Sequence, residues 1–151
     1  MINNLIVELG HIFLITSLAL SLSQFALTFF KINKKPIFIP IISILAFVCT
    51  MISFSALMFS FVVSDFSVDL VAKFSHTSKP LIYKISGLWA NHEGSLLLWI
   101  LILQLFGLIT SLVKLPDGFH SILNSIQGLL SSLFLSLCLF SSNPFHRSEI
   151  I

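Results

Sequence analysis

Four uninterrupted apolar stretches limit the possible folds of this chain more than any other feature. They cover approximately residues 5–30, 37–63, 95–113 and 121–140. A helix rises 1.5 Å per residue, so about 20 residues cross the ~30 Å hydrocarbon layer of a membrane. Backbone groups in lipid must find their hydrogen bonds within the segment, so each stretch is expected to be an α-helix. The sequence therefore predicts an all-α integral membrane protein with about four transmembrane helices.

The composition agrees with lipid as the solvent. Only 9% of the 151 residues are charged and 56% are hydrophobic, whereas about 25% of the residues in soluble domains are charged. We expect residues 1–151 to form a single membrane domain in contact with the lipid bilayer. The net charge of +2 provides no basic face for a phosphate backbone, so nucleic acid is not an expected partner.

The cysteines and histidines show no spacing typical of a metal site. Cys49 and Cys138 each lie inside an apolar stretch without a second cysteine nearby, and we interpret both as packing residues. No two of the five histidines are three or four positions apart. The sequence therefore predicts neither a metal centre nor a self-contained heme site.

Three of the predicted helices carry small or hydroxyl residues at helical spacing. These residues are Ser17, Ser21, Gln24 and Thr28 in the first helix, Ser43, Ala46, Thr50, Ser53 and Ser60 in the second, and Ser121, Asn124, Gly128, Ser131 and Ser132 in the fourth. Such stripes let helices approach closely and form hydrogen bonds with one another. They favour a packed bundle with partners outside this chain. A polar pathway through the membrane is the alternative, although the absence of ionisable groups from the stripes disfavours it.

The connections between the helices differ in length and charge. Residues 31–36 are short and contain Lys31, Lys34 and Lys35, residues 114–120 form a short turn, and residues 64–94 form a long loop. Lysine-rich short loops favour the inner side of a membrane. We therefore expect the N-terminus and the long loop 64–94 to lie on the outer face.

Two local patterns occur in the long loop. Apolar and polar residues mostly alternate from 66 to 75, which predicts a short extended segment. After Pro80 the apolar residues follow a helical period: Leu81, Ile82, Ile85, Leu88 and Trp89. This second pattern is typical of a short helix in the membrane interface, between the second and third transmembrane helices.

The densest polar cluster lies between the two tryptophans of the chain. The candidate site residues of this segment are Trp89, Asn91, His92, Glu93, Gly94, Ser95 and Trp99. One interpretation is helix capping, in which Asn91 accepts a hydrogen bond from the start of the third helix and Glu93 gains from the helix dipole. In the other interpretation, His92 and Glu93 contact a bound group at the membrane surface. A helix through all of residues 89–99 would place Trp99 ~15 Å deeper than Trp89.

Residues 83–99 (YKISGLWANHEGSLLLW) closely resemble a signature of the CcmF family of cytochrome c heme lyases. That signature has a Trp, two small or polar residues, His or Gln, and then Glu-Gly-Ser-Leu-Leu-Leu-Trp. Residues 8–10 (ELG), 61–66 (FVVSDF) and 142–145 (SNPF) also resemble the family, in the same order. The family accepts His or Gln at position 92, which argues against obligatory metal ligation there.

The resemblance implies a reaction and a location. CcmF-type lyases attach heme through thioether bonds to the reduced CxxCH thiols of apocytochrome c, on the bacterial periplasmic or mitochondrial intermembrane-space face. The expected home is therefore a bacterial inner membrane or the mitochondrial inner membrane. Abundant Phe, Ile, Ser, Lys and Asn are typical of AT-rich coding, so a mitochondrial version would be organelle-encoded.

Family members are several times longer, and their heme-binding histidines and tryptophan-rich segment lie beyond the region that this chain resembles. We therefore expect a membrane subunit or N-terminal fragment that helps position heme or apocytochrome c, with other lyase fragments as partners. No catalytic residue and no heme ligand is assigned in this chain. A split lyase and a truncated product both fit, and the polar stripes favour reassembly. A heme-export transporter component and a non-catalytic respiratory-complex subunit are the alternative functions.

Overall fold

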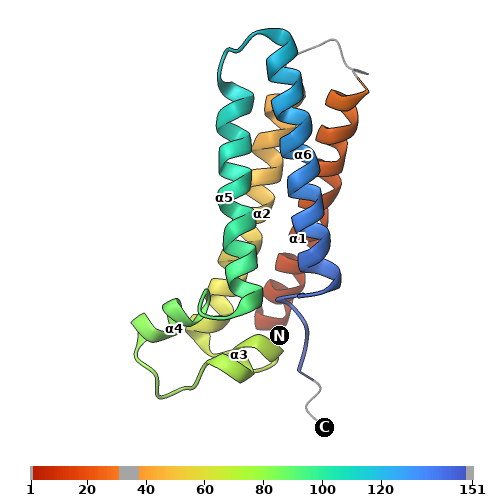
Figure 1. Ribbon diagram of the computed structural model, residues 1–151. Helices are drawn as coiled ribbons and strands as arrows, with labels where there is room; N and C mark the ends of the chain where they lie inside the picture. The colour runs from red at the N-terminus through yellow and green to blue at the C-terminus, as the bar shows by residue number, and fades with distance from the viewer. Residues whose placement is uncertain (1, 31–37, 149–151) are drawn as a thin grey trace.

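The computed structural model describes residues 2–30 and 38–148, and within them it shows four long helices and two short ones (Figure 1). The helices are α1 (Ile2–Phe29), α2 (Phe38–Val63), α3 (Asp69–Phe74), α4 (Leu81–Gly87), α5 (His92–Leu112) and α6 (Asp117–Phe140). The four long helices are long and apolar enough to cross a membrane. The predicted all-α membrane fold is confirmed.

The helix boundaries differ from the predicted ones at several ends. α5 begins at His92 rather than at 95, because Asn91 caps it, and α6 begins at Asp117 rather than at 121, directly after Pro116. α1 begins at Ile2, three residues before the predicted start. The predicted start of the second helix at residue 37 and the basic connection 31–36, with Lys31, Lys34 and Lys35, lie outside the described residues.

The four long helices form a closed bundle. α1 packs against α2 and α6, and α5 packs against the same two helices from the other side (Figure 1). α1 and α6 approach each other closely at Gly128, where an added Cβ would lie 2.7 Å from the amide nitrogen of Phe25. There is therefore no room for a side chain larger than that of glycine at position 128.

The polar stripes predicted on α1, α2 and α6 meet inside the bundle. The hydroxyls of Ser17 and Thr50 are 2.7 Å apart, and Ser43 donates to the side-chain oxygen of Gln24 at 3.1 Å. The amide nitrogen of Gln24 in turn donates to the backbone oxygen of Asn124 at 3.3 Å. The stripes thus provide hydrogen-bond partners for one another across helices of this chain, which matches the packing interpretation rather than a polar pathway. The expectation of partners outside this chain stays a prediction.

α5 contributes a polar residue to this interior that has no counterpart in the predicted stripes. The side-chain nitrogen of Gln104 donates to the hydroxyl of Ser21 at 2.8 Å, and Gln104 is almost fully buried. An unpaired amide in this water-free interior would cost on the order of 2–7 kcal/mol. Gln104 therefore fixes the position of α5 against α1.

The extended segment predicted for residues 66–75 is wrong over most of its length, because residues 69–74 form the helix α3. Val68 and Val71, three positions apart, are both fully buried on the same side. Lys73 and Asp69, four positions apart, form an ion pair of 2.6 Å on the exposed side. The hydrogen bond to Asp69 and its charge raise the pKa of Lys73. Only Val68 keeps an extended pairing, an isolated antiparallel bridge to Arg147.

The helix predicted after Pro80 is present as α4, but it is shorter than the apolar pattern indicates. α4 ends at Gly87, and the chain then turns through residues 88–91 before α5 begins. Leu88 is fully buried in this turn instead of lying on an exposed apolar face. α3, α4, the start of α1 and the segment after α6 lie at one end of the bundle (Figure 1), which we call the α3–α4 end.

Candidate functional site at the α3–α4 end

The candidate segment 89–99 is organised around the side chain of Asn91. Its Oδ1 accepts a hydrogen bond from the backbone N–H of Gly94 at 2.7 Å, which is the N-cap bond of α5. Its Nδ2 donates to the backbone oxygens of Gly87 at 2.8 Å and Leu88 at 3.1 Å. One buried amide therefore joins the end of α4 to the start of α5, and the capping interpretation of Asn91 is correct.

Gly94 completes this turn because only glycine fits there. A Cβ on residue 94 would overlap the backbone oxygen of Leu88 and lie 3.1 Å from Oδ1 of Asn91. Because one of these neighbours is backbone, it has no rotamer by which to move aside. Asn91 and Gly94 therefore both stabilise the turn between α4 and α5.

Replacing Asn91 with Ala should lower the free energy of unfolding by about 2 kcal/mol, because one helix cap and two buried carbonyl partners are lost together. The loss is measurable by chemical unfolding of the purified chain in micelles. Ser95→Ala is the matched control, since the Ser95 hydroxyl donates only to the exposed backbone oxygen of His92 at 3.0 Å. Equal stability of the Asn91→Ala and Ser95→Ala chains would contradict this role.

The two ionisable residues of the motif lie in different surroundings. His92 is exposed, whereas Glu93 is partly buried and faces a polar cavity of about 300 Å³. The other residues that line this cavity are Asp69, Leu139, Phe140, Ser141, Ser142, Asn143 and His146. Within residues 2–30 and 38–148, no three His, Cys, Asp or Glu side chains are placed to hold a metal ion.

The two tryptophans are both accessible, but they do not share one helix. Trp89 is 43% exposed and lies in the turn before α5, while Trp99 is 67% exposed on α5 itself. The ~15 Å difference in depth between the two tryptophans required a continuous helix from 89 to 99. The chain is not helical from 88 to 91, so that difference does not apply. Trp99 borders a small apolar cavity of about 100 Å³ with Leu103 and Phe134, on the side of the bundle rather than at its end.

The position of the C-terminal segment at this end of the bundle was not predictable from the sequence. Nδ2 of Asn143 lies 3.2 Å from Nε2 of His11, and Arg147 pairs with Glu8 at 2.8 Å. The ring of Phe145 covers Gly10, where an added Cβ would lie 2.6 Å from it. The signal was present in the sequence, since residues 8–10 and 142–145 both resemble the CcmF family, but no spacing rule connects positions more than 130 residues apart.

The C-terminal segment also closes over the long loop. The backbone N–H of Asp69 donates to the backbone oxygen of His146, and the N–H of Ser148 donates to the oxygen of Ser67, both at 3.0 Å. The start of α3 and the first three turns of α1 are thus joined by one stretch of chain, which also borders the cavity that Glu93 faces. The segments that resemble the family, apart from residues 96–99 within α5, therefore gather at the α3–α4 end.

Comparison with known proteins extends the resemblance over almost the whole chain. The chain is 40% identical over 152 residues to the cytochrome c-type biogenesis protein ccl1 of Rhodobacter capsulatus, which covers 96% of this chain. It is also 40% identical over 149 residues to the cytochrome c-type biogenesis protein CycK of Rhizobium meliloti, covering 95% of this chain. A solved structure of the cytochrome c heme lyase CcmF superposes with a TM-score of 0.85 at 26% identity over 93% of the chain.

The chain is homologous to part of CcmF. No family model matches it, so the assignment depends on these relatives and on the structural match. The chain spans less than a quarter of the length of the two curated relatives (23% and 22%) and 25% of the solved CcmF chain. This CcmF-like chain shares its membrane-helical fold with the solved CcmF structure, and both relatives named above are bacterial.

Proposed function

We propose that this chain is a membrane subunit or N-terminal fragment of a cytochrome c heme lyase, which helps position heme or apocytochrome c for thioether attachment. The observation that carries the proposal is the convergence at the α3–α4 end. Residues 8–10, 61–66, 83–95 and 142–145, separate in the sequence, are brought to that end by hydrogen bonds and packing. The homology to CcmF supports a role for this end in heme attachment.

The contacts divide the candidate residues into two groups. The side chains of Asn91 and Ser95 form hydrogen bonds at the start of α5, and Gly94 fits there because it has no side chain. Trp89, His92 and Trp99 are exposed, and Glu93 faces a cavity. We propose that this second group contacts heme, apocytochrome c or a neighbouring lyase chain. Heme is a substrate here, with its ligands supplied by other parts of the complex.

We further propose that the α3–α4 end lies on the outer face of an inner membrane, periplasmic in a bacterium or in the intermembrane space of a mitochondrion. In the sequence, Lys31, Lys34 and Lys35 are concentrated in the short connection between α1 and α2, whereas the basic residues 73, 79, 84 and 147 are spread over longer stretches. The positive-inside rule counts Lys and Arg in short loops, so this concentration supports the proposed orientation.

Affinity purification of the tagged chain from its native membranes tests the proposal. We expect mass spectrometry to recover further chains with cytochrome c biogenesis sequences, and an absorption spectrum of the complex to show heme. The purified single chain should bind little heme. Recovery with a respiratory complex, or saturable one-to-one heme binding by the single chain with a histidine-ligated spectrum, would contradict the proposal.

A further inference from the structure

A basic segment with an exposed apolar helix separates the two transmembrane halves of the chain. Between Asp69 and Glu93 the sequence contains three lysines, Lys73, Lys79 and Lys84, and no acidic residue. Lys73 is in an ion pair with Asp69. Within the part of the chain that the structure describes, Lys79 and Lys84 belong to no ion pair. This segment therefore carries two positive charges that the fold does not neutralise.

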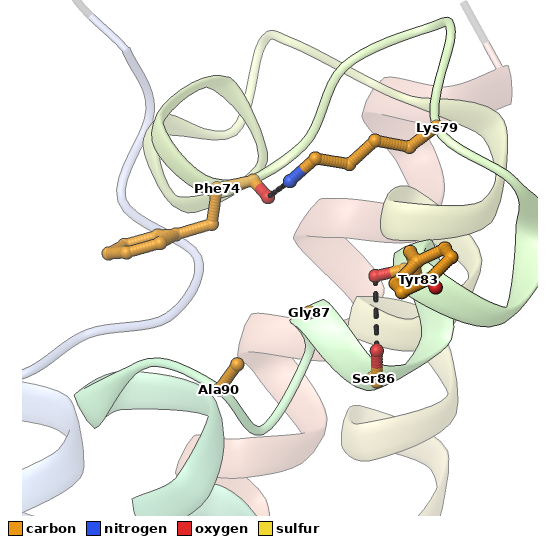
Figure 2. A pocket seen from close by; sticks show the side chains of 6 residues that line it. All are labelled: Phe74, Lys79, Tyr83, Ser86, Gly87 and Ala90. Carbon is orange, nitrogen blue, oxygen red and sulfur yellow. Dashed lines mark hydrogen bonds between the residues drawn. The ribbon is translucent and has the colours of Figure 1, made fainter.

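The segment encloses a cavity of about 310 Å³ between the end of α3 and α4 (Figure 2). Its walls are formed by Phe74, Lys79, Tyr83, Ser86, Gly87 and Ala90. Figure 2 shows the Lys79 side chain stretched from its loop to the Phe74 backbone oxygen, to which its amine donates at 3.0 Å. One hydrogen bond leaves the ammonium group two further donors. The positively charged amine of Lys79 therefore lies beside a mostly apolar cavity.

The first turn of α4 is apolar and exposed over much of its circumference. Leu81, Ile82 and Tyr83 are consecutive and are 58%, 71% and 62% exposed. α4 packs against α2 and projects sideways at the level where α2 ends and α5 begins (Figure 1). In a membrane this is the level of the headgroups, where exposed aromatic and apolar residues flanked by lysines insert into the lipid boundary.

We propose that the α3–α4 cavity binds the headgroup of an anionic phospholipid, with its phosphate at Lys79 and its acyl chains along the exposed apolar residues of α4. The charges favour an anion, and the apolar surface favours one that carries hydrocarbon. The bilayer supplies such a molecule at this depth. A bound lipid would hold α4 in the interface and so fix the turn at Asn91 that starts α5. The proposal does not depend on the lyase function.

Fluorescence of Trp89 reports directly on the site, because Trp89 adjoins the cavity residue Ala90. In Trp99→Phe, Trp89 is the sole tryptophan of the chain. The variant is placed in phosphatidylcholine discs that contain a small fraction of phosphatidylglycerol or phosphatidylcholine, each brominated near the headgroup end of its acyl chains. We expect brominated phosphatidylglycerol to quench Trp89 at a several-fold lower mole fraction than brominated phosphatidylcholine.

Lysine variants then locate the effect. Lys79→Ala should raise the phosphatidylglycerol fraction needed for half-quenching by about fivefold, since each lysine near an anionic surface contributes about that factor. Lys79→Arg keeps the charge and should keep the preference. Lys114→Ala is the matched control, because it removes the same charge from the opposite end of the bundle. Native mass spectrometry of the same lysine variants, with Trp99 retained, should give the same result. We expect less bound phosphatidylglycerol on Lys79→Ala than on Lys79→Arg or Lys114→Ala.

Three results would overturn the proposal. The first is equal quenching by the two brominated lipids, which would mean that the headgroup is not recognised. The second is an equal effect of Lys79→Ala and Lys114→Ala, which would mean that the preference reflects net charge alone. The third is loss of the preference in inorganic phosphate at constant ionic strength, which would mean that the cavity is a site for a free anion.

Discussion

Replacing Gly94 with Ala is expected to lower the free energy of unfolding by about 3 kcal/mol and to leave little of the chain folded in membranes. The added methyl group would overlap the backbone oxygen of Leu88, and overpacking against a fixed neighbour costs about 1–3 kcal/mol or more. Leu88 is fully buried, so the turn cannot move outward without exposing it. The start of α5 and the Asn91 cap would be displaced together.

Chemical unfolding in micelles and the amount of chain recovered from membranes both measure this effect. Gly118→Ala is the matched control, since nothing lies within 4 Å of a Cβ at position 118. Gly118 lies in the first turn of α6, where alanine favours the helix by up to ~1 kcal/mol. We therefore expect Gly118→Ala to be neutral or slightly stabilising. A Gly94→Ala chain as stable as Gly118→Ala would show that the turn at 88–94 is not as described.

A leucine at position 128 is expected to push α6 away from α1 and to lower the free energy of unfolding by about 3 kcal/mol. Gly128 faces the backbone of Phe25, with an added Cβ 2.7 Å from the amide nitrogen and 3.0 Å from Cα. Separation of these helices would also break the hydrogen bond from Gln24 to the Asn124 backbone. Close helix contact at small residues is the main source of helix association in lipid, so little would replace it.

Cross-linking measures the separation directly. Cysteines introduced at one facing pair on α1 and α6, in a background without Cys49 and Cys138, should join rapidly in the parent chain and slowly in Gly128→Leu. Gly118→Leu makes the same change at an open position of the same helix and should leave the rate unchanged. Equal rates in all three chains would contradict the close approach of α1 and α6 at Gly128.

The four transmembrane helices were predictable because lipid allows so few structures. Length, apolar composition and the need for internal backbone hydrogen bonds were sufficient. The helix starts were less accurate because capping extends α5 beyond its apolar run, to His92. α3 was missed because the alternation of residues 66–75 suggested a strand. The ion pair of Asp69 and Lys73 at helical spacing was the better signal.

Within the candidate site at 89–99, the helix cap was predictable from the sequence, and the role of the site stays a prediction. An asparagine before an apolar helix indicated a cap, which the structure shows. The steric need for Gly94 depends on where Leu88 lies, which no local pattern contains. The pairing of Asn143 with His11, and of Arg147 with Glu8, depends on how the bundle closes. Contacts over such separations follow from the fold alone.

The most direct test of the account is to remove this chain and measure covalently attached heme. Proteins from the source membranes are separated under denaturing conditions and stained for heme peroxidase activity, which detects only heme that remains covalently bound. We expect deletion to abolish the c-type cytochrome bands, a wild-type or Gly118→Ala copy to restore them, and b-type heme in the membranes to remain. Full-intensity c-type bands in the deletion strain would contradict a role in heme attachment.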